Sequence, residues 1–140
     1  MGAEIPTRET LIGHLKEAAE AEHSLCCQYL YAAFSLRRVA TDYPADLPKD
    51  SVALLMADTQ HWATQIFYVA RQEMEHLAIV TNCLAALGER PHFSHGNFPD
   101  QRLSELLGSP MELARCDETA IARFQHIERP PGLDSGPPPP

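Results

Sequence analysis

Three residues with metal-ligating side chains lie where apolar residues are expected. Glu22 belongs to a segment of helical periodicity and, at about 100° per residue, points within roughly 20° of that segment's apolar stripe. Glu73 and His76 repeat the pattern in a second segment, three residues apart and therefore neighbours on one helix surface. A carboxylate in an apolar core is unfavourable unless it is paired, protonated or bound to a cation. The three residues predict a metal site, and they are also the candidate catalytic residues.

Carboxylates and a single imidazole suit hard, oxidisable metal ions. A carboxylate can bridge two cations or bind one through both oxygens, and the i, i+3 spacing aims Glu73 and His76 at the same point. Such donor sets favour iron or manganese, and we expect iron, with a di-iron centre favoured and manganese as the alternative. Glu17 and Glu20 fall on the far side of the first helix, and Glu75 points away from the second stripe. We expect Glu17 and Glu20 to be solvated and Glu75 to lie outside the ligand set.

Two long helices are needed to position the candidate ligands. The first is expected from about residue 7 to 38, and the second from about residue 51 to 87, either continuous or broken near Asp58. Gly88 is the residue type expected just past a helix end. A short connection between two such helices predicts an antiparallel pair. The apolar stripes consist of Leu11, Leu15, Ala18, Leu25, Tyr29, Ala33 and Leu36 in the first helix, and Trp62, Ile66, Val69, Val80, Leu84 and Leu87 in the second.

The remainder of the chain has a different character. Residues 91–99 predict an ordered loop, and a short helix is expected over 102–107. Ser109 to Glu112 could begin a further helix, but we favour one over 118–128 that is capped by Asp117. We expect one helical domain over residues 1–130 and a proline-rich tail over 131–140 that is disordered or extended.

Composition excludes several classes of partner. The 140 residues carry a net charge of −8, which argues against binding to nucleic acid or to anionic membranes. No apolar run approaches the roughly 20 residues that span a bilayer, and the first residues do not form a signal peptide. The four cysteines show no CxxC spacing and are expected to be reduced thiols, which predicts a cytoplasmic protein.

Two stretches of the sequence resemble a known family. Residues 18–36 (AAEAEHSLCCQYLYAAFSL) look like the first helix of ferritin-like proteins. Residues 69–93 (VARQEMEHLAIVTNCLAALGERPHF) are similar to the iminophenyl-pyruvate dimer synthase type of ferritin-like domain. The Glu-His-Ser and Glu-Met-x-His-Leu signatures of that domain correspond to residues 22–24 and 73–77, and residues 124–130 (FQHIERP) fit its short helix that ends in Ile-Glu-x-Pro. The resemblance covers roughly residues 8–130.

The resemblance implies a biosynthetic context, because such domains occur in enzymes that couple two amino-acid-derived imines. It also implies that Glu22, Glu73 and His76 are half of a di-iron ligand set, since ferritin-like sites use two Glu residues and two Glu-x-x-His motifs. Either two chains associate to complete a four-helix bundle, or the chain keeps the shape and has lost or altered the chemistry. We expect the first, an all-α, ferritin-like homodimer, because a two-fold axis doubles three ligands into six.

The leading hypothesis for function is a metal-dependent, non-haem iron oxidoreductase that acts on a small-molecule substrate in natural-product biosynthesis. One alternative is a half-ferritin that oxidises and stores iron. Another is a non-catalytic helical partner of a biosynthetic enzyme, in which Glu22 and His76 pair with each other.

Other polar residues are weaker candidates. His92 and His95 form an HxxH pair in a loop, which lacks the rigid presentation of a helix. Asp58 and His61 precede the second motif, and Tyr29 is either a metal neighbour or a core residue. Thiols at Cys26 and Cys83 could bind a metal, although buried cysteine is usually a small apolar residue. Their roles stay open.

Overall fold

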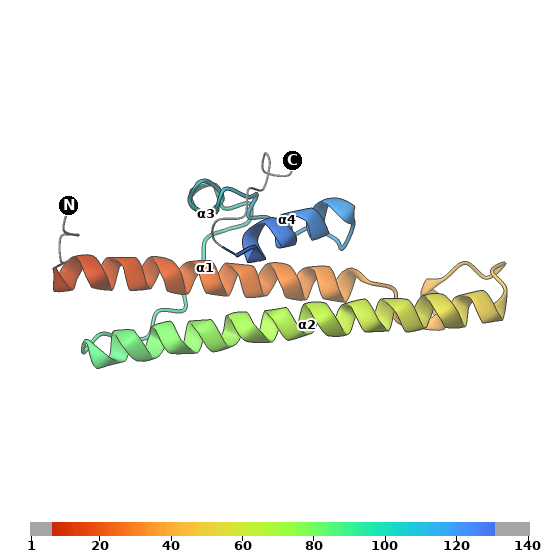
Figure 1. The fold of residues 1–140 in the computed structure, drawn as a ribbon, viewed down its shortest axis with the longest axis horizontal. Coiled ribbons are helices and arrows are strands. Elements are labelled where there is room, and N and C mark those ends of the chain that lie inside the picture. The colour runs from red at the N-terminus through yellow and green to blue at the C-terminus, as the bar shows by residue number, and fades with distance from the viewer. Residues whose placement is uncertain (1–6, 131–140) are drawn as a thin grey trace.

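The computed structural model describes residues 7–130, and this range is helical with no strand. Two long helices, α1 (Arg8–Ser35) and α2 (Lys49–Ala86), form an antiparallel pair whose connection contains the 3-10 helix η1 (Ala40–Asp42). Two short helices, α3 (Gln101–Leu107) and α4 (Glu118–Glu128), lie against the middle of this pair (Figure 1). The expected all-α, ferritin-like fold is confirmed. The predicted tail, residues 131–140, lies outside the described residues.

The ends of α1 and α2 follow from local hydrogen bonds. The Thr7 side chain accepts a hydrogen bond from the Thr10 amide and caps the start of α1. This helix ends at Ser35, about three residues earlier than expected, because Asp42 Oδ2 accepts hydrogen bonds from the amides of Arg38 and Val39. Those amides then cannot continue the helical ladder. Helix α2 is continuous through the exposed Asp58 and is followed by a residue with positive φ, Gly88.

The segment between α3 and α4 is not helical, which resolves the ambiguity at residues 109–112. The Asp100 amide donates to the Met111 carbonyl oxygen at 2.8 Å, and the Met111 amide donates to Ser104 Oγ at 2.8 Å. These bonds tie the segment to α3 and keep it out of a helix. Asp117 caps α4 by accepting from the Ala120 amide, so the later helix start is confirmed.

The core lies where α3 and α4 cover the helix pair. Phe124 of α4 packs on the buried Tyr29 of α1 with ring centroids 4.5 Å apart, and Ile66 of α2 belongs to the same cluster. Tyr29 and Ile66 are therefore buried within one chain, and Leu84, which is not part of this cluster, is buried as well. Two other residues of the predicted stripes, Leu11 and Trp62, are 38% and 52% exposed.

Two further expectations from the sequence concern membrane spans and the cysteines. Within residues 7–130, none of the helices combines the length and hydropathy that a membrane span requires. The four cysteines are free thiols, of which Cys26 is buried and Cys83 exposed.

Candidate metal centre

The three predicted ligands converge between the middles of α1 and α2. His76 Nδ1 lies 3.4 Å from Glu22 Oε2 and 3.7 Å from Glu73 Oε1. One donor atom from each residue falls within 4.8 Å of the other two, which is a separation that one metal ion can bridge. The i, i+3 spacing on α2 and the antiparallel alignment of α1 together produce this convergence.

Glu73 is the innermost of the three donors, and its surroundings oppose its negative charge. Burial raises the pKa of its carboxyl group to about 9, and the hydrogen bond and charge of Glu22 contribute further, followed by the charge of Glu128. A bound cation would reverse this balance, since it stabilises both carboxylates at once. Two oxygen donors and an imidazole therefore fit a hard divalent metal ion.

The centre has an inner and an outer side. The Glu73 side chain is 5% exposed, Glu22 is 23% exposed, and His76 is 51% exposed. Two carboxylates thus lie towards the protein interior, whereas the imidazole lies at the solvent boundary. Water or a small molecule can approach the donors from the side of His76.

Nearby carboxylates do not join the centre, but only some of them are solvated as we expected. Glu75 is exposed and points away from the ligand set, as predicted, and it pairs with Arg71 one turn earlier at 3.0 Å. Glu20 is half-buried, and this corrects our expectation: its Oε1 lies 2.9 Å from His92 Nε2, and its Oε2 pairs with Arg102. Arg102 also lies 3.2 Å from Glu17. These contacts fasten the loop and α3 to the outer face of α1.

The two loop histidines bind different partners and do not form a ligand pair. His92 contacts Glu20, whereas the His95 ring lies edge-on to His23, with centroids 4.7 Å apart. Asp58 and His61 are exposed on α2. The loop histidines therefore hold the loop against α1, and neither is among the three grouped donors.

A further carboxylate, Glu128, whose charge acts on Glu73, was not among our predicted ligands. Tyr29 Oη donates a hydrogen bond to Glu128 Oε1 at 2.5 Å. Burial first, and then this bond and the charge of Glu128, raise the pKa of the tyrosine. Glu128 follows the buried Phe124 by four residues, so it continues the inward stripe of α4, a signal that the sequence already contained. Buried Cys26 lies on the Glu22 side of α1, and burial, then the charges of Cys27 and Glu73, raise the pKa of its thiol.

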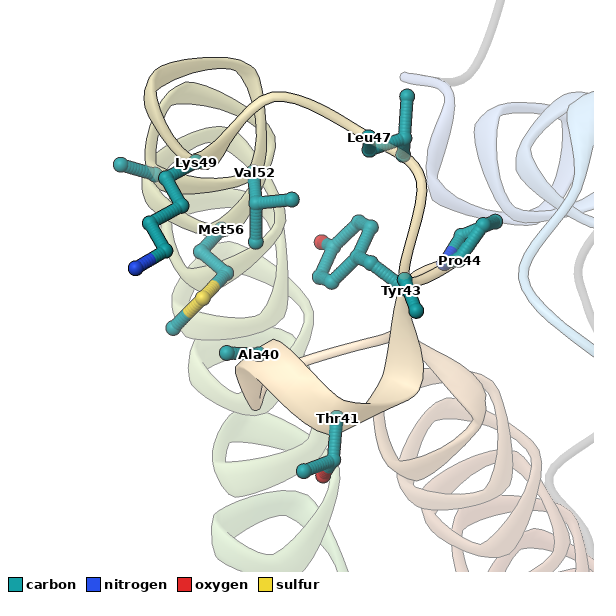
Figure 2. Close-up of a pocket in the computed structure, with 10 residues that line it drawn as sticks. Ala40, Thr41, Tyr43, Pro44, Leu47, Lys49, Val52 and Met56 are labelled. Carbon is teal, nitrogen blue, oxygen red and sulfur yellow. The ribbon is translucent and has the colours of Figure 1, made fainter.

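A pocket lies away from these donors, at the connected end of the helix pair, where η1 joins α1 to α2. It has a volume of about 660 Å³, and the Tyr43 ring points across it towards Val52 and Met56 (Figure 2). Lys49 is the charged residue of its lining, which contains no carboxylate or imidazole. The segment of α2 that lines it ends roughly 25 Å from Glu73 along the helix, at about 1.5 Å per residue. The chemistry-bearing residues therefore belong to the middle of the molecule.

Comparison with known proteins agrees with the fold. The Ferritin-like family model matches residues 15–137, and the chain belongs to that family. It is 28% identical to dichlorochromopyrrolate synthase of Lentzea aerocolonigenes over 94% of this chain and 14% of that protein. It is also 28% identical to 2-imino-3-(indol-3-yl)propanoate dimerase of Chromobacterium violaceum over 91% of this chain and 14% of that protein. The chain thus spans about one seventh of the length of these relatives. No solved structure matches it significantly.

Proposed function

We propose that this ferritin-like domain binds iron through Glu22, Glu73 and His76 and acts as a non-haem oxidoreductase on a small molecule in natural-product biosynthesis. The observation that carries the proposal is the buried Glu73 carboxyl group, which faces a second carboxylate and a half-exposed imidazole within bonding reach of one ion. Manganese would fit the same donors. The biosynthetic context is supported by the relatives, since both are named for reactions that make or join natural-product units.

The three residues of this chain would bind the ion from different depths below the surface. Glu73 and Glu22 would hold the ion from the inner side, and His76 would hold it at the boundary with solvent. When bound, the metal would supply one-electron redox chemistry that no amino-acid side chain provides. Glu73 would also lose the proton that burial favours on its carboxyl group. Metal binding would therefore release a proton to solvent.

Metal content is the first test. After expression in iron-replete medium, wild-type protein should contain iron or manganese in near-stoichiometric amounts by elemental analysis. Glu73→Ala should lose most of it because it removes the deepest donor. Glu75→Ala is the matched control, since Glu75 is exposed, lies two residues away and pairs with Arg71. Equal metal content in the two variants would contradict the assignment.

A second candidate function is supported by the contacts of His76. In its protonated form this side chain would make an ion pair with Glu22 at 3.4 Å, as a purely structural helical partner would require. Protein that contains no metal after reconstitution with ferrous iron would favour this candidate. Iron storage is distinguished from catalysis by stoichiometry, because storage predicts many iron atoms oxidised per chain, whereas an oxidoreductase consumes oxygen together with a small substrate.

A further inference from the structure

Another pocket lies where the end of α1, the neighbouring part of α2 and the segment before α4 meet. Figure 1 shows the start of α4 over the C-terminal end of α1, and a hydrogen bond joins the two segments there. The pocket has a volume of about 360 Å³, which is within the usual range for small-molecule sites. Two arginines line it, Arg37 from the end of α1 and Arg115 from the approach to α4, and we call it the arginine pocket.

The other polar groups of the arginine pocket already have partners inside the protein. Ser35 Oγ accepts from the Cys116 amide at 2.8 Å, and Thr59 Oγ1 donates to the Arg37 carbonyl oxygen at 2.7 Å. The Asp117 carboxylate caps α4. Burial, and then the charge of Asp117, raises the pKa of the Cys116 thiol, so this group stays neutral. These side chains therefore hold the pocket together and leave its two guanidinium groups to face a ligand.

Neither guanidinium group forms an ion pair with a carboxylate of residues 7–130. Four other arginines of this range do so, namely Arg8, Arg71, Arg102 and Arg123. Carboxylates are abundant in the chain, which has 19 acidic and 11 basic side chains. The guanidinium carbon of Arg37 lies 5.9 Å from the centroid of the Tyr43 ring, and this contact restricts its orientation. The arginine pocket thus contains two positive charges that the described part of the chain does not neutralise.

The rest of the lining determines which kind of anion fits. A guanidinium group binds a planar carboxylate through two parallel hydrogen bonds. Leu36, Tyr43 and Leu55 add apolar surface beside the arginines. We propose that the arginine pocket binds a small organic carboxylate with an apolar body, whose charged group contacts Arg37 and Arg115. The arginines would select the charge, and the apolar side chains would contact the body of the ligand.

The arginine pocket is separate from the metal centre, so the inference does not rest on the proposed function. Ser35 lies 13 residues after Glu22 on α1, and Thr59 lies 14 residues before Glu73 on α2. At about 1.5 Å per residue, both helices separate the pocket from the donors by roughly 20 Å. The bound carboxylate would therefore be a stabilising ligand and not the reacting molecule. It would link the end of α1 to the approach to α4 and so raise the melting temperature.

Calorimetric titration with benzoate tests the proposal, because benzoate joins one carboxylate to an apolar ring. Benzamide has the same shape without the charge and should bind at least about tenfold more weakly. Inorganic phosphate, which lacks an apolar body, should also bind more weakly than benzoate. Arg37→Gln and Arg115→Gln should each lower the affinity for benzoate by about tenfold. Arg90→Gln is the matched control and should leave the affinity unchanged, because it removes the same charge at an exposed position beyond the other end of α2.

Several results would overturn the proposal. Benzoate that does not bind the wild type, or that binds all three arginine variants with equal affinity, would exclude the arginine pocket as its site. Phosphate that binds as tightly as benzoate would exclude a requirement for an apolar body. If Arg37→Gln proves unfolded by circular dichroism, Arg115→Gln decides the matter, since Arg115 is exposed.

Glu73→Ala distinguishes this inference from the proposed function. That variant should lose metal and keep its affinity for benzoate, because the two sites are roughly 20 Å apart. Loss of benzoate binding in Glu73→Ala would assign the anion to the metal centre and overturn the inference. Wild-type protein that binds benzoate through both arginines but no iron or manganese would overturn the proposed function alone.

Discussion

Glu73 shows how a single buried carboxyl group links stability to metal binding. Burial, together with the hydrogen bond and charge of Glu22, raises its pKa from 4.5 to about 9 in the metal-free protein. The folded state therefore binds this proton more tightly than the unfolded state does. The stabilisation from the proton is fully present below about pH 4.5, and it is lost as the pH rises towards about 9.

A Glu73→Gln variant should remove this dependence. The amide has no proton to lose, so the metal-free variant should be more stable than wild type at pH 8 and should show a flatter loss of stability between pH 6 and pH 8. Urea unfolding at both pH values, in the presence of a chelator, measures the difference. Glu75→Gln serves as the control because Glu75 is exposed. Parallel pH profiles for wild type and Glu73→Gln would show that Glu73 is ionised in the metal-free fold.

At the scale of the elements, α4 depends on a few buried contacts. An isolated helix of 11 residues is only marginally stable in water, so packing must hold it in place. Phe124 is its largest buried side chain, and it covers Tyr29. The Cys116 amide also donates to Ser35 Oγ at 2.8 Å, which ties the approach to α4 to the end of α1.

Removal of the Phe124 ring should therefore cost about 3 kcal/mol in the free energy of unfolding, the lower part of the range for Phe→Ala substitutions in cores. Because Phe124 packs on Tyr29, which lies two turns after Glu22 on the same face of α1, Phe124→Ala should also weaken metal binding even though it removes no donor. Chemical denaturation followed by circular dichroism measures the first effect, and a metal titration measures the second. Gln125→Ala, at an exposed neighbouring position, should change neither. A loss below about 1 kcal/mol in Phe124→Ala would show that other contacts dock α4.

The elements also show which features a sequence can predict. The long helices and their inward donors were predictable because apolar periodicity and the Glu73–His76 spacing are local signals. The environment of Glu20 was not, since its partners His92 and Arg102 lie 72 and 82 residues away. The spacing of Glu128 to Phe124 indicates on which side of α4 it lies, but its partner was not predictable: its hydrogen bond to Tyr29 spans 99 residues, and helix periodicity does not specify which residues meet across the fold.

At the scale of the whole molecule, one face of α2 carries apolar side chains that no part of residues 7–130 buries. Leu54, Tyr68 and Ile79 are 70%, 57% and 60% exposed. They project within about 40° of one another around the helix. The His76 side chain projects from the adjacent side of the helix. We propose that a second copy of the chain covers this face, which would also enclose the open side of the metal centre.

Light scattering at micromolar concentration should then report a dimer for the wild type. Ile79→Arg should yield monomers, because it places a charge in the middle of the proposed interface. Met74→Arg is the matched control: Met74 is 57% exposed, but it projects from a different side of α2. A monomeric wild type, or dissociation by both substitutions alike, would contradict a dimer formed through this face.

The connected end of the helix pair extends beyond α3 and α4 (Figure 1). It is held by its own small network, in which Tyr43 Oη and Thr59 Oγ1 both donate to the Arg37 carbonyl oxygen. Ala45 and Asp46, in the connection itself, are exposed. Each doubling in the length of such a loop costs only about 0.6 kcal/mol in closure entropy. This end could therefore accept an inserted module, such as a tag or an additional binding domain, without disturbing the carboxylates at the centre of the protein.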